Sequence, residues 1–302
     1  MLLLGTAAGG GFPQWNCWCP TCRAARAAPE HARPRTQSSI ALSADGERWF
    51  LCNASPDVRE QLARLRDGSA PPAGMRHVPI DGILLTDAEL DHSLGIALLR
   101  EGRRLHLWVT SAVARTLEED SRILPVTRAF ADVVVTELTV DCELLLRDAD
   151  GAPAGLAVQP FAVPGDPPRF ASIDAPGHTV GLIVRDVATG ARCAYVPGCG
   201  ALDDVLLARL AAADLLLFDG TFWSDDELIA LGIGTRGARD MGHLPISGPH
   251  GSREALSRLP CRRKVYTHIN NTNRILLEDS PERRAVEAAG LEVGMDGMRF
   301  VM

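Results

Sequence analysis

Short apolar segments bounded by Gly, Pro, Asn or Asp recur along the whole chain. Segments of roughly 4–8 aliphatic residues are typical of β-strands, because a strand buried on both faces needs no polar positions. The sequence therefore predicts strands over residues 39–42, 49–53, 83–86, 105–110, 133–136, 156–163, 180–184, 191–196, 215–218 and 265–268, and in the C-terminal region 291–301.

Amphipathic stretches lie between many of these strands. They predict helices over residues 94–100, 112–121, 202–212, 225–231, 252–259 and 281–289. A further helix is expected after Ser55, which suits an N-cap, with Pro56 in the first turn and Gly68 just beyond the end. Residues 68–82 and 163–178 are rich in Gly and Pro and are expected to be loops.

The order of these elements favours an α/β protein. Strands adjoin one another in the first half, and helices recur in both halves. Two packed sheets with helices outside, an αββα four-layer sandwich, explain this order better than a doubly wound sheet does. We expect a single domain over residues 1–302.

Composition narrows the function classes. The 31 basic and 38 acidic residues give a net charge of −7, which argues against nucleic acid as a partner. No apolar run approaches the roughly 20 residues of a membrane span, and the N-terminal residues lack a basic leader. We therefore expect a cytoplasmic protein with no membrane partner, in a compartment where clustered cysteines more often bind metal than form disulfides.

Three of the eight cysteines fall within six residues, at positions 17, 19 and 22. Zn²⁺ binds thiolates in tetrahedral geometry, and a turn with these spacings can direct all three sulfurs to one ion. The alternative is a chance group of free thiols. A fourth ligand would have to come from a distant part of the chain, so the metal would fix the N-terminal loop to another part of the fold.

A second polar cluster follows the apolar strand 83–86. Asp87, Glu89, Asp91 and His92 lie within six residues, and burying so many carboxylates is costly without a cation. An acidic, solvated helix start explains the same residues equally well, since carboxylates favour the first turn. The residues alone do not decide between these interpretations.

The segment resembles the metallo-β-lactamase signature Thr-His-x-His-x-Asp-His. Asp87 and Glu89 stand where the signature has its two leading histidines, whereas Asp91 and His92 match. Later segments are similar, in order, to motifs of the branch that contains tRNase Z and the PhnP-type phosphodiesterases: residues 217–222, 241–244 and 266–269. PhnP-type proteins also carry the Cys-x-Cys-x-x-Cys loop.

The similarity to one family is closer and covers essentially the whole chain. Five runs resemble the PqqB family of pyrroloquinoline quinone (PQQ) biosynthesis: residues 9–17, 35–41, 51–57, 86–92 and 268–273. The resemblance implies a metallo-β-lactamase fold and a role in making the cofactor from a cross-linked Glu-Tyr precursor. Its expected partners are a small amino-acid-derived substrate and other proteins of the same pathway.

The resemblance also implies which ligands are lost and which are kept. Related hydrolases hold two metals, and the first is held by the leading histidines and a third histidine that falls in residues 164–167, where this chain has none. The bridging aspartate is absent from residues 197–200. The second set survives as Asp91, His92 and His268. Two imidazoles and one carboxylate form the facial triad of Fe(II) oxygenases, which leaves positions for substrate and O₂.

Other residues receive supporting roles. His243 can accept a phenol proton, and Asp219 can hydrogen-bond a ligand histidine; a loop histidine and a turn cap are the respective alternatives. Asp87 and Glu89 are further catalytic candidates. We expect His178 to lie in a surface turn. Asn271 occupies the position of the fourth zinc ligand of PhnP-type relatives, so the expected structural zinc set is Cys17, Cys19, Cys22 and Asn271.

Three function classes follow. The first is an oxygenase that uses Fe(II) and O₂ to hydroxylate the tyrosine ring of the precursor. The second is a metal-dependent hydrolase of the PhnP or tRNase Z type, which the lost histidines disfavour. The third is a carrier that transports PQQ or its precursor to the periplasm, which has no need of the surviving triad.

Overall fold

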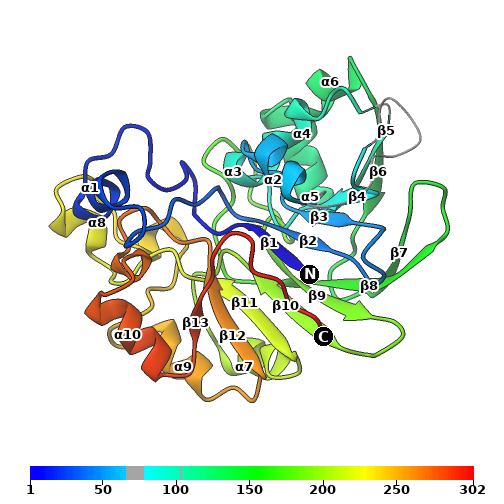
Figure 1. Ribbon diagram of the computed structural model, residues 1–302. Helices are drawn as coiled ribbons and strands as arrows, with labels where there is room; N and C mark the ends of the chain where they lie inside the picture. Colours follow the sequence, from blue (N-terminus) through cyan, green and yellow to red (C-terminus); the bar gives the residue numbers. More distant parts are fainter. Residues whose placement is uncertain (66–77, 103) are drawn as a thin grey trace.

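Two β-sheets face each other, and helices cover the outer side of each (Figure 1). The computed structural model describes residues 1–65, 78–102 and 104–302. This arrangement confirms the predicted αββα sandwich. Whether the chain forms a single domain over 1–302 stays a prediction.

The first sheet has the strand order β1-β2-β3-β4-β5-β6. Its first two pairings are antiparallel and the others are parallel. The strands are β1 (Leu2–Gly5), β2 (Ser39–Leu42), β3 (Phe50–Cys52), β4 (Gly82–Leu84), β5 (Arg104–Val109) and β6 (Asp132–Glu137).

The second sheet has the order β13-β12-β11-β10-β9-β8-β7, with parallel pairings from β10 to β13 and antiparallel pairings in the rest. Its strands are β7 (Leu144–Arg147), β8 (Pro153–Ala162), β9 (Val180–Asp186), β10 (Arg192–Val196), β11 (Leu215–Asp219), β12 (Arg263–Thr267) and β13 (Glu292–Val293).

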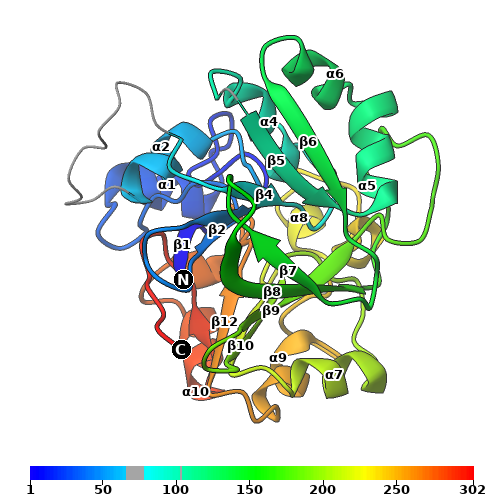
Figure 2. The same ribbon diagram turned by 90° about the vertical axis from the view of Figure 1, so that its right-hand side faces the viewer.

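The helices are short. They are α1 (Pro20–Ala27), α2 (Val58–Leu65), α3 (Leu90–Ser93), α4 (Gly95–Leu98), α5 (Ser111–Arg115), α6 (Ile123–Arg128), α7 (Asp204–Leu210), α8 (Glu227–Ala230), α9 (Ser252–Ser257) and α10 (Pro281–Ala288), with a π-helical turn over Thr116–Asp120 and 3-10 turns over Arg239–Met241 and Arg274–Leu276. Figure 2 shows α4, α5 and α6 on the side of the first sheet and α7, α9 and α10 on the side of the second.

Alternation along the strands divides the buried side chains into three layers. On β1, Leu3 faces the other sheet, while Leu2 and Leu4 pack under the helices of the first sheet. On β11, Leu217 faces the other sheet, while Leu216 packs under the helices of the second. Successive strand residues point to opposite faces, so one apolar run supplies two cores.

The structure corrects several predicted elements. Strands β1 and β7 and helices α1 and α6 were not among the predicted elements, and the C-terminal strand is limited to the two residues of β13. The predicted helix 94–100 is two short helices, α3 and α4, which begin earlier because the polar turn after β4 is itself helical. The predicted helix 112–121 changes to a π-helical turn at Thr116.

The helix predicted after Ser55 begins at Val58, and the Ser55 hydroxyl accepts a hydrogen bond from the Asp57 amide. Gly68 and residues 68–77 of the predicted loop lie outside the described residues. None of the helices in the described parts of the chain has the length and hydropathy of a bilayer-spanning segment. The cytoplasmic location stays a prediction.

Candidate functional site

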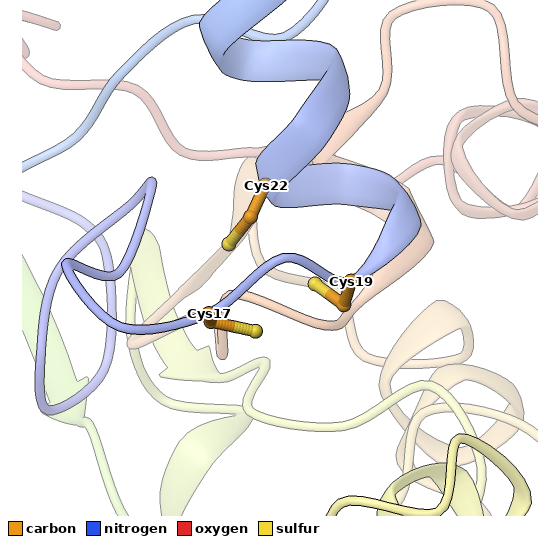
Figure 3. Close-up of side chains that lie close together, drawn as sticks. All are labelled: Cys17, Cys19 and Cys22. Carbon is orange, nitrogen blue, oxygen red and sulfur yellow. The ribbon is translucent and has the colours of Figure 1, made fainter.

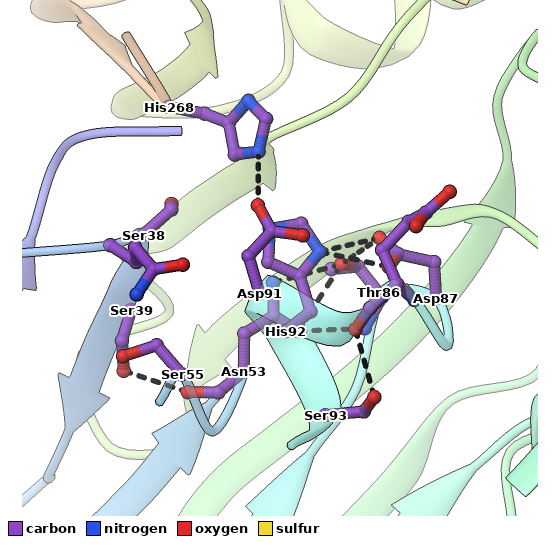
Figure 4. A network of polar contacts seen from close by, with 12 residues as sticks. Ser38, Ser39, Asn53, Ser55, Thr86, Asp87, Asp91, His92, Ser93 and His268 are labelled. Carbon is purple, nitrogen blue, oxygen red and sulfur yellow. Dashed lines mark hydrogen bonds and ion pairs between the residues drawn. The ribbon is translucent and has the colours of Figure 1, made fainter. Parts of the chain in front are cut away.

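The polar turn that follows β4 gathers carboxylates and an imidazole at the carboxyl end of the first sheet. Asn53, at the end of β3, binds Thr86 through both its amide nitrogen and its amide oxygen. The Thr86 hydroxyl in turn donates to Asp87 at 2.8 Å. These buried bonds fix the start of the turn, so α3 presents Asp91 and His92 in a defined direction (Figure 4).

His92 is held by one nitrogen and left open at the other. Its Nδ1 lies 2.8 Å from both carboxylate oxygens of Asp87. Its Nε2 is buried and has no hydrogen-bond partner among the described residues. Burial disfavours the charged ring, but Asp87 and Asp91 outweigh this and raise the pKa of His92 to about 9. An oriented imidazole with a buried, unpaired Nε2 is the arrangement of a metal ligand supported by a carboxylate.

His268 approaches from the second sheet, directly after β12. Its backbone is left-handed, with φ of 53°, and this turns the ring toward α3. The His268 Nε2 lies 3.2 Å from Oδ2 of Asp91, which lies 4.0 Å from Nε2 of His92. One donor atom from each of these residues lies within 4.8 Å of the others, a spacing that one ion can bridge (Figure 4).

The Thr221 hydroxyl determines which nitrogen of His268 is free. It lies 2.6 Å from Oδ1 of Asp219 and 2.8 Å from Nδ1 of His268. The hydroxyl also lies 2.9 Å from the His268 carbonyl oxygen. A carboxylate and a carbonyl only accept, so the single hydroxyl hydrogen goes to one of these two oxygens and the hydroxyl oxygen accepts from the His268 Nδ1–H. The lone pair on Nε2 of His268 is then directed at the site.

Asp219 ends β11 and is fully buried. Its oxygens accept from the Cys199 amide at 3.0 Å, from the amide and hydroxyl of Thr221, and from Nδ1 of His243 at 2.7 Å. Burial opposes ionisation, yet His243 and these donors hold the pKa of Asp219 below its usual range. Asp219, His243 and His268 also lie close enough to hold an ion, but both Asp219 oxygens are already used.

His243 is the third imidazole at the site. Its ring stacks on that of His268, with centroids 5.5 Å apart, and it lines the cavity above the donors. Burial lowers the pKa of His243, but the Asp219 carboxylate outweighs it and the net shift is upward. Because Nδ1 is bound to Asp219, Nε2 is the nitrogen left for a molecule in the cavity. Its predicted catalytic role stays a prediction, and so does that of Asp219.

A cavity of about 680 Å³ opens over these donors. Its walls come from segments far apart in the sequence: residues 8–10, 87–92, 165–170, 236–243 and 268–270. Glu89 lies in this wall, where burial and the neighbouring Asp87 and Asp91 raise its pKa to about 7. A β-carbon on Gly9 would lie 3.3 Å from Oδ2 of Asp91, so the N-terminal loop passes against the site as its glycines suggest.

The cysteine cluster lies beside the segment that follows β12 and carries His268 and Asn271. Cys17 and Cys19 are on the loop before α1, Cys22 is in its first turn, and the three sulfurs point toward a common space (Figure 3). The Asn271 Nδ2 lies 3.3 Å from the Cys22 sulfur and 3.7 Å from that of Cys19. A metal held here by the Asn271 side chain would need its amide oxygen, which requires a half-turn of the amide group.

The ionisation of two of these thiols is shifted in opposite directions. Burial raises the pKa of Cys22 to about 11. Burial also opposes ionisation of Cys19, but hydrogen bonds, above all from Thr21, outweigh it and lower the pKa of that thiol. Cys19 is thus the thiol best prepared to bind a cation.

Two further positions bear on the lost metal set. His178 lies in a turn, where its ring nitrogens face the carbonyl oxygens of Ala175 and Gly165 rather than the donors. Cys199, in the segment where the bridging aspartate is expected, is buried and bonds to the Ala201 carbonyl. Burial raises the pKa of its thiol to about 12, so it offers no thiolate.

Sequence reasoning did not single out Thr221, Gln37, Arg169 or Arg236, although all four line the cavity. Thr221 lies in the motif Asp219-Gly220-Thr221, which was the available signal. The arginines lie in irregular loops without a recognisable pattern.

The two sheets, the donors at their carboxyl ends and the cavity above them define a protein of the metallo-β-lactamase fold with a metal-binding site. Residues 48–269 match the family model of the β-lactamase superfamily domain. Within this class the chain belongs to the family of coenzyme PQQ synthesis protein B. It is 45% identical to the member from Methylobacterium nodulans over 98% of both chains. It is 44% identical to that of Gluconacetobacter diazotrophicus, over 99% of this chain and 98% of the relative.

Solved structures agree. The crystal structure of Zn²⁺-bound PqqB from Methylobacterium extorquens superimposes with a TM-score of 0.90 at 41% identity, over 100% of this chain and 99% of that one. A diphosphatase of the PhnP family superimposes with a TM-score of 0.66 at 20% identity, over 100% of this chain and 96% of that one. The second likeness concerns the fold alone.

Proposed function

We propose that this protein acts in PQQ biosynthesis as an Fe(II)- and O₂-dependent hydroxylase of the tyrosine ring in a Glu-Tyr-derived precursor. The observation that carries the proposal is the set Asp91, His92 and His268, with two imidazoles and one carboxylate directed at one point under a cavity. This donor set suits non-haem iron and leaves open positions for other ligands. The pathway is taken from the family to which the chain belongs.

Iron bound there would supply the activation of O₂. One oxygen atom enters a ring C–H bond as a hydroxyl group and the other leaves as water, with two protons and two electrons from an external reductant. The buried, unpaired Nε2 of His92 supports a resident cation, because a buried polar atom without a partner is costly. Asp87 and Thr221 occupy Nδ1 of the two histidines, so Nε2 of each ring is the atom left to bind a metal in place of a proton.

The chain's own residues also provide for the proton of the phenol. His243 lines the cavity with Nδ1 held by Asp219, which leaves Nε2 as the proton acceptor. A carboxylate behind an imidazole stabilises the charged ring that results. Deprotonating the phenol increases the electron density of the ring, and this favours attack by an electrophilic oxidant.

The hydrolase alternative has weaker support. Both carboxylate oxygens of Asp87 contact Nδ1 of His92, Cys199 offers no thiolate, and Asp166 stands in the loop where the third histidine is expected. A dinuclear site therefore lacks its first set of ligands. The carrier alternative does not explain the triad or the His243–Asp219 pair, because a carrier needs neither metal ligands nor a proton acceptor.

The test begins with metal-free protein, loaded anaerobically with Fe(II). The cross-linked Glu-Tyr amino acid, a reductant and ¹⁸O₂ are then added, and the product is analysed by mass spectrometry. A mass gain that carries ¹⁸O supports the proposal. Cleavage of a phosphodiester without O₂ would favour the hydrolase instead, and no change of either kind would refute both enzyme assignments.

A structural zinc at Cys17, Cys19 and Cys22 is part of the same proposal. Three thiols within one turn form most of a closed tetrahedral site. Asn271 is the nearest side chain from outside the loop, and its carbonyl oxygen also lies 3.7 Å from the Cys19 sulfur. Either oxygen of this residue can complete the four ligands.

A further inference from the structure

The cavity has an uneven distribution of charge. Asp91 is one of the metal donors, and the acids Asp87 and Glu89 line the cavity beside it. The only arginines among the described lining residues, Arg169 and Arg236, come from two other loops. A fourth acid, Asp166, shares the loop of Arg169 but does not pair with it within 4.0 Å. The cavity wall therefore combines acids beside the metal donors with two guanidinium groups on other loops.

These two guanidinium groups are unused by the fold. Neither Arg169 nor Arg236 makes an ion pair or side-chain hydrogen bond with the described residues, and both are exposed. Some arginines of this protein are paired, as Arg185 is with Glu143 at 2.6 Å and Arg209 is with Asp141, whereas exposed arginines outside the cavity, such as Arg59, also lack a partner among the described residues. Holding a cation in a cavity wall without a protein partner leaves its donors for a ligand.

We propose that Arg169 and Arg236 bind the carboxylates of the substrate and thereby direct its aromatic ring to the metal donors. This inference rests on the proposed function, because it takes the ligand to be an amino-acid-derived aromatic compound. Arginine presents a planar set of donors that matches a carboxylate with two parallel hydrogen bonds.

The experiment measures binding without turnover. Zinc-loaded protein is titrated anaerobically, by calorimetry, with the cross-linked Glu-Tyr amino acid and separately with its methyl ester, which keeps the ring but removes the carboxylate charges. The variants are Arg169→Gln, Arg236→Gln and the double variant. Arg59→Gln, an exposed arginine of α2 outside the cavity, is the matched control. Thermal unfolding checks that each variant is folded.

We expect each single variant to weaken binding of the acid by roughly 10-fold or more, as for a lost hydrogen bond between charged groups, while ester binding and the control stay unchanged. Equal affinity of the wild type and the double variant for the acid would overturn the inference, as would equal affinity of the wild type for acid and ester.

Two outcomes separate this inference from the proposed function. Arginine-dependent binding without oxygen insertion by the iron-loaded wild type would leave the inference standing and defeat the hydroxylase. Hydroxylation with an unchanged KM in the double variant would do the reverse.

Discussion

The two donor clusters of this protein are built on opposite principles. Asp91, His92 and His268 come from two different sheets, and each imidazole is fixed by a second hydrogen bond at its other nitrogen. The three cysteines come from one loop and the first turn of one helix. The first cluster forms only when the two sheets pack together, and it faces a cavity. The second cluster is formed within one short segment, and its three thiols already supply most of the ligands of a tetrahedral metal site. The same difference separates a catalytic metal site, which keeps a position open for substrate, from a structural metal site, which only stabilises the fold.

The clusters meet in one short segment. His268 contributes to the first and Asn271 lies against the second, and between them Ile269 exchanges backbone hydrogen bonds with the N-terminal residues Thr6 and Ala8. The experiments that follow ask whether the two clusters are as different in function as they are in construction.

The largest effect is expected from removing an imidazole of the first cluster. His92→Ala or His268→Ala should abolish iron binding and reduce hydroxylation by more than roughly 100-fold, since even residues that only support metal ligands cost 10- to 100-fold. Metal analysis and turnover measure this, with circular dichroism as the check on folding. His178→Ala is the control and should keep both. Full iron content in either ligand variant would contradict the assignment.

The second cluster should respond in stability rather than in turnover. Cys19→Ser should remove about one equivalent of zinc and lower the melting temperature by roughly 5–10 °C, because binding of a structural metal is linked to folding. Iron binding should be only partly impaired. Metal analysis and calorimetry are the measurements, and Cys142→Ser, an exposed thiol, is the control. Full zinc content and unchanged stability in Cys19→Ser would mean that the cysteine cluster does not hold a structural zinc.

A smaller effect tests the second hydrogen bond of His92. Asp87→Asn keeps the volume of the side chain but loses the carboxylate behind Nδ1, so iron affinity should fall roughly 10- to 100-fold. Competition with a chelator measures it. Glu89→Gln makes a sharp contrast, because Glu89 makes no side-chain hydrogen bond to an imidazole among the described residues. If both variants lost affinity equally, Asp87 would have no special role behind His92.

The smallest effect is expected at Cys199. Cys199→Ala should leave iron and zinc content and turnover unchanged and cost about 1 kcal/mol of unfolding free energy, as for a small buried side chain. Chemical denaturation measures the stability. Loss of a metal equivalent from this variant would mean that a thiol outside both clusters binds metal.

The fold could be predicted in outline because buried strands consist of runs of consecutive aliphatic residues. The strand 39–42 has the predicted bounds. Helix α6 was missed because Pro125 breaks its pattern, and β7 was missed because it is short and half-exposed at the edge of a sheet. Helix α1 was missed because its start coincides with the Cys-x-Cys-x-x-Cys cluster, which is typical of a metal-binding loop, although Pro20 is a helix-start signal.

The site could be anticipated where a motif carries it. His92 and His268 were identified from such motifs, and the structure brings them together from positions far apart in the sequence. Thr221 was missed although it lies in the motif Asp219-Gly220-Thr221, because the sequence does not show that its hydroxyl links Asp219 to His268. Arg169 and Arg236 depend on how two irregular loops fold over the cavity, which local patterns do not encode.

The close passage of Gly9 against Asp91 sets a limit on engineering. At Gly9 and Gly10 the cavity wall is the main chain itself, so no substitution at these two positions can make it wider. A designer who wants to admit a bulkier molecule must work on walls with removable bulk, such as Phe170, Phe222 and Met241. The space available to this protein is thus adjustable from one side only.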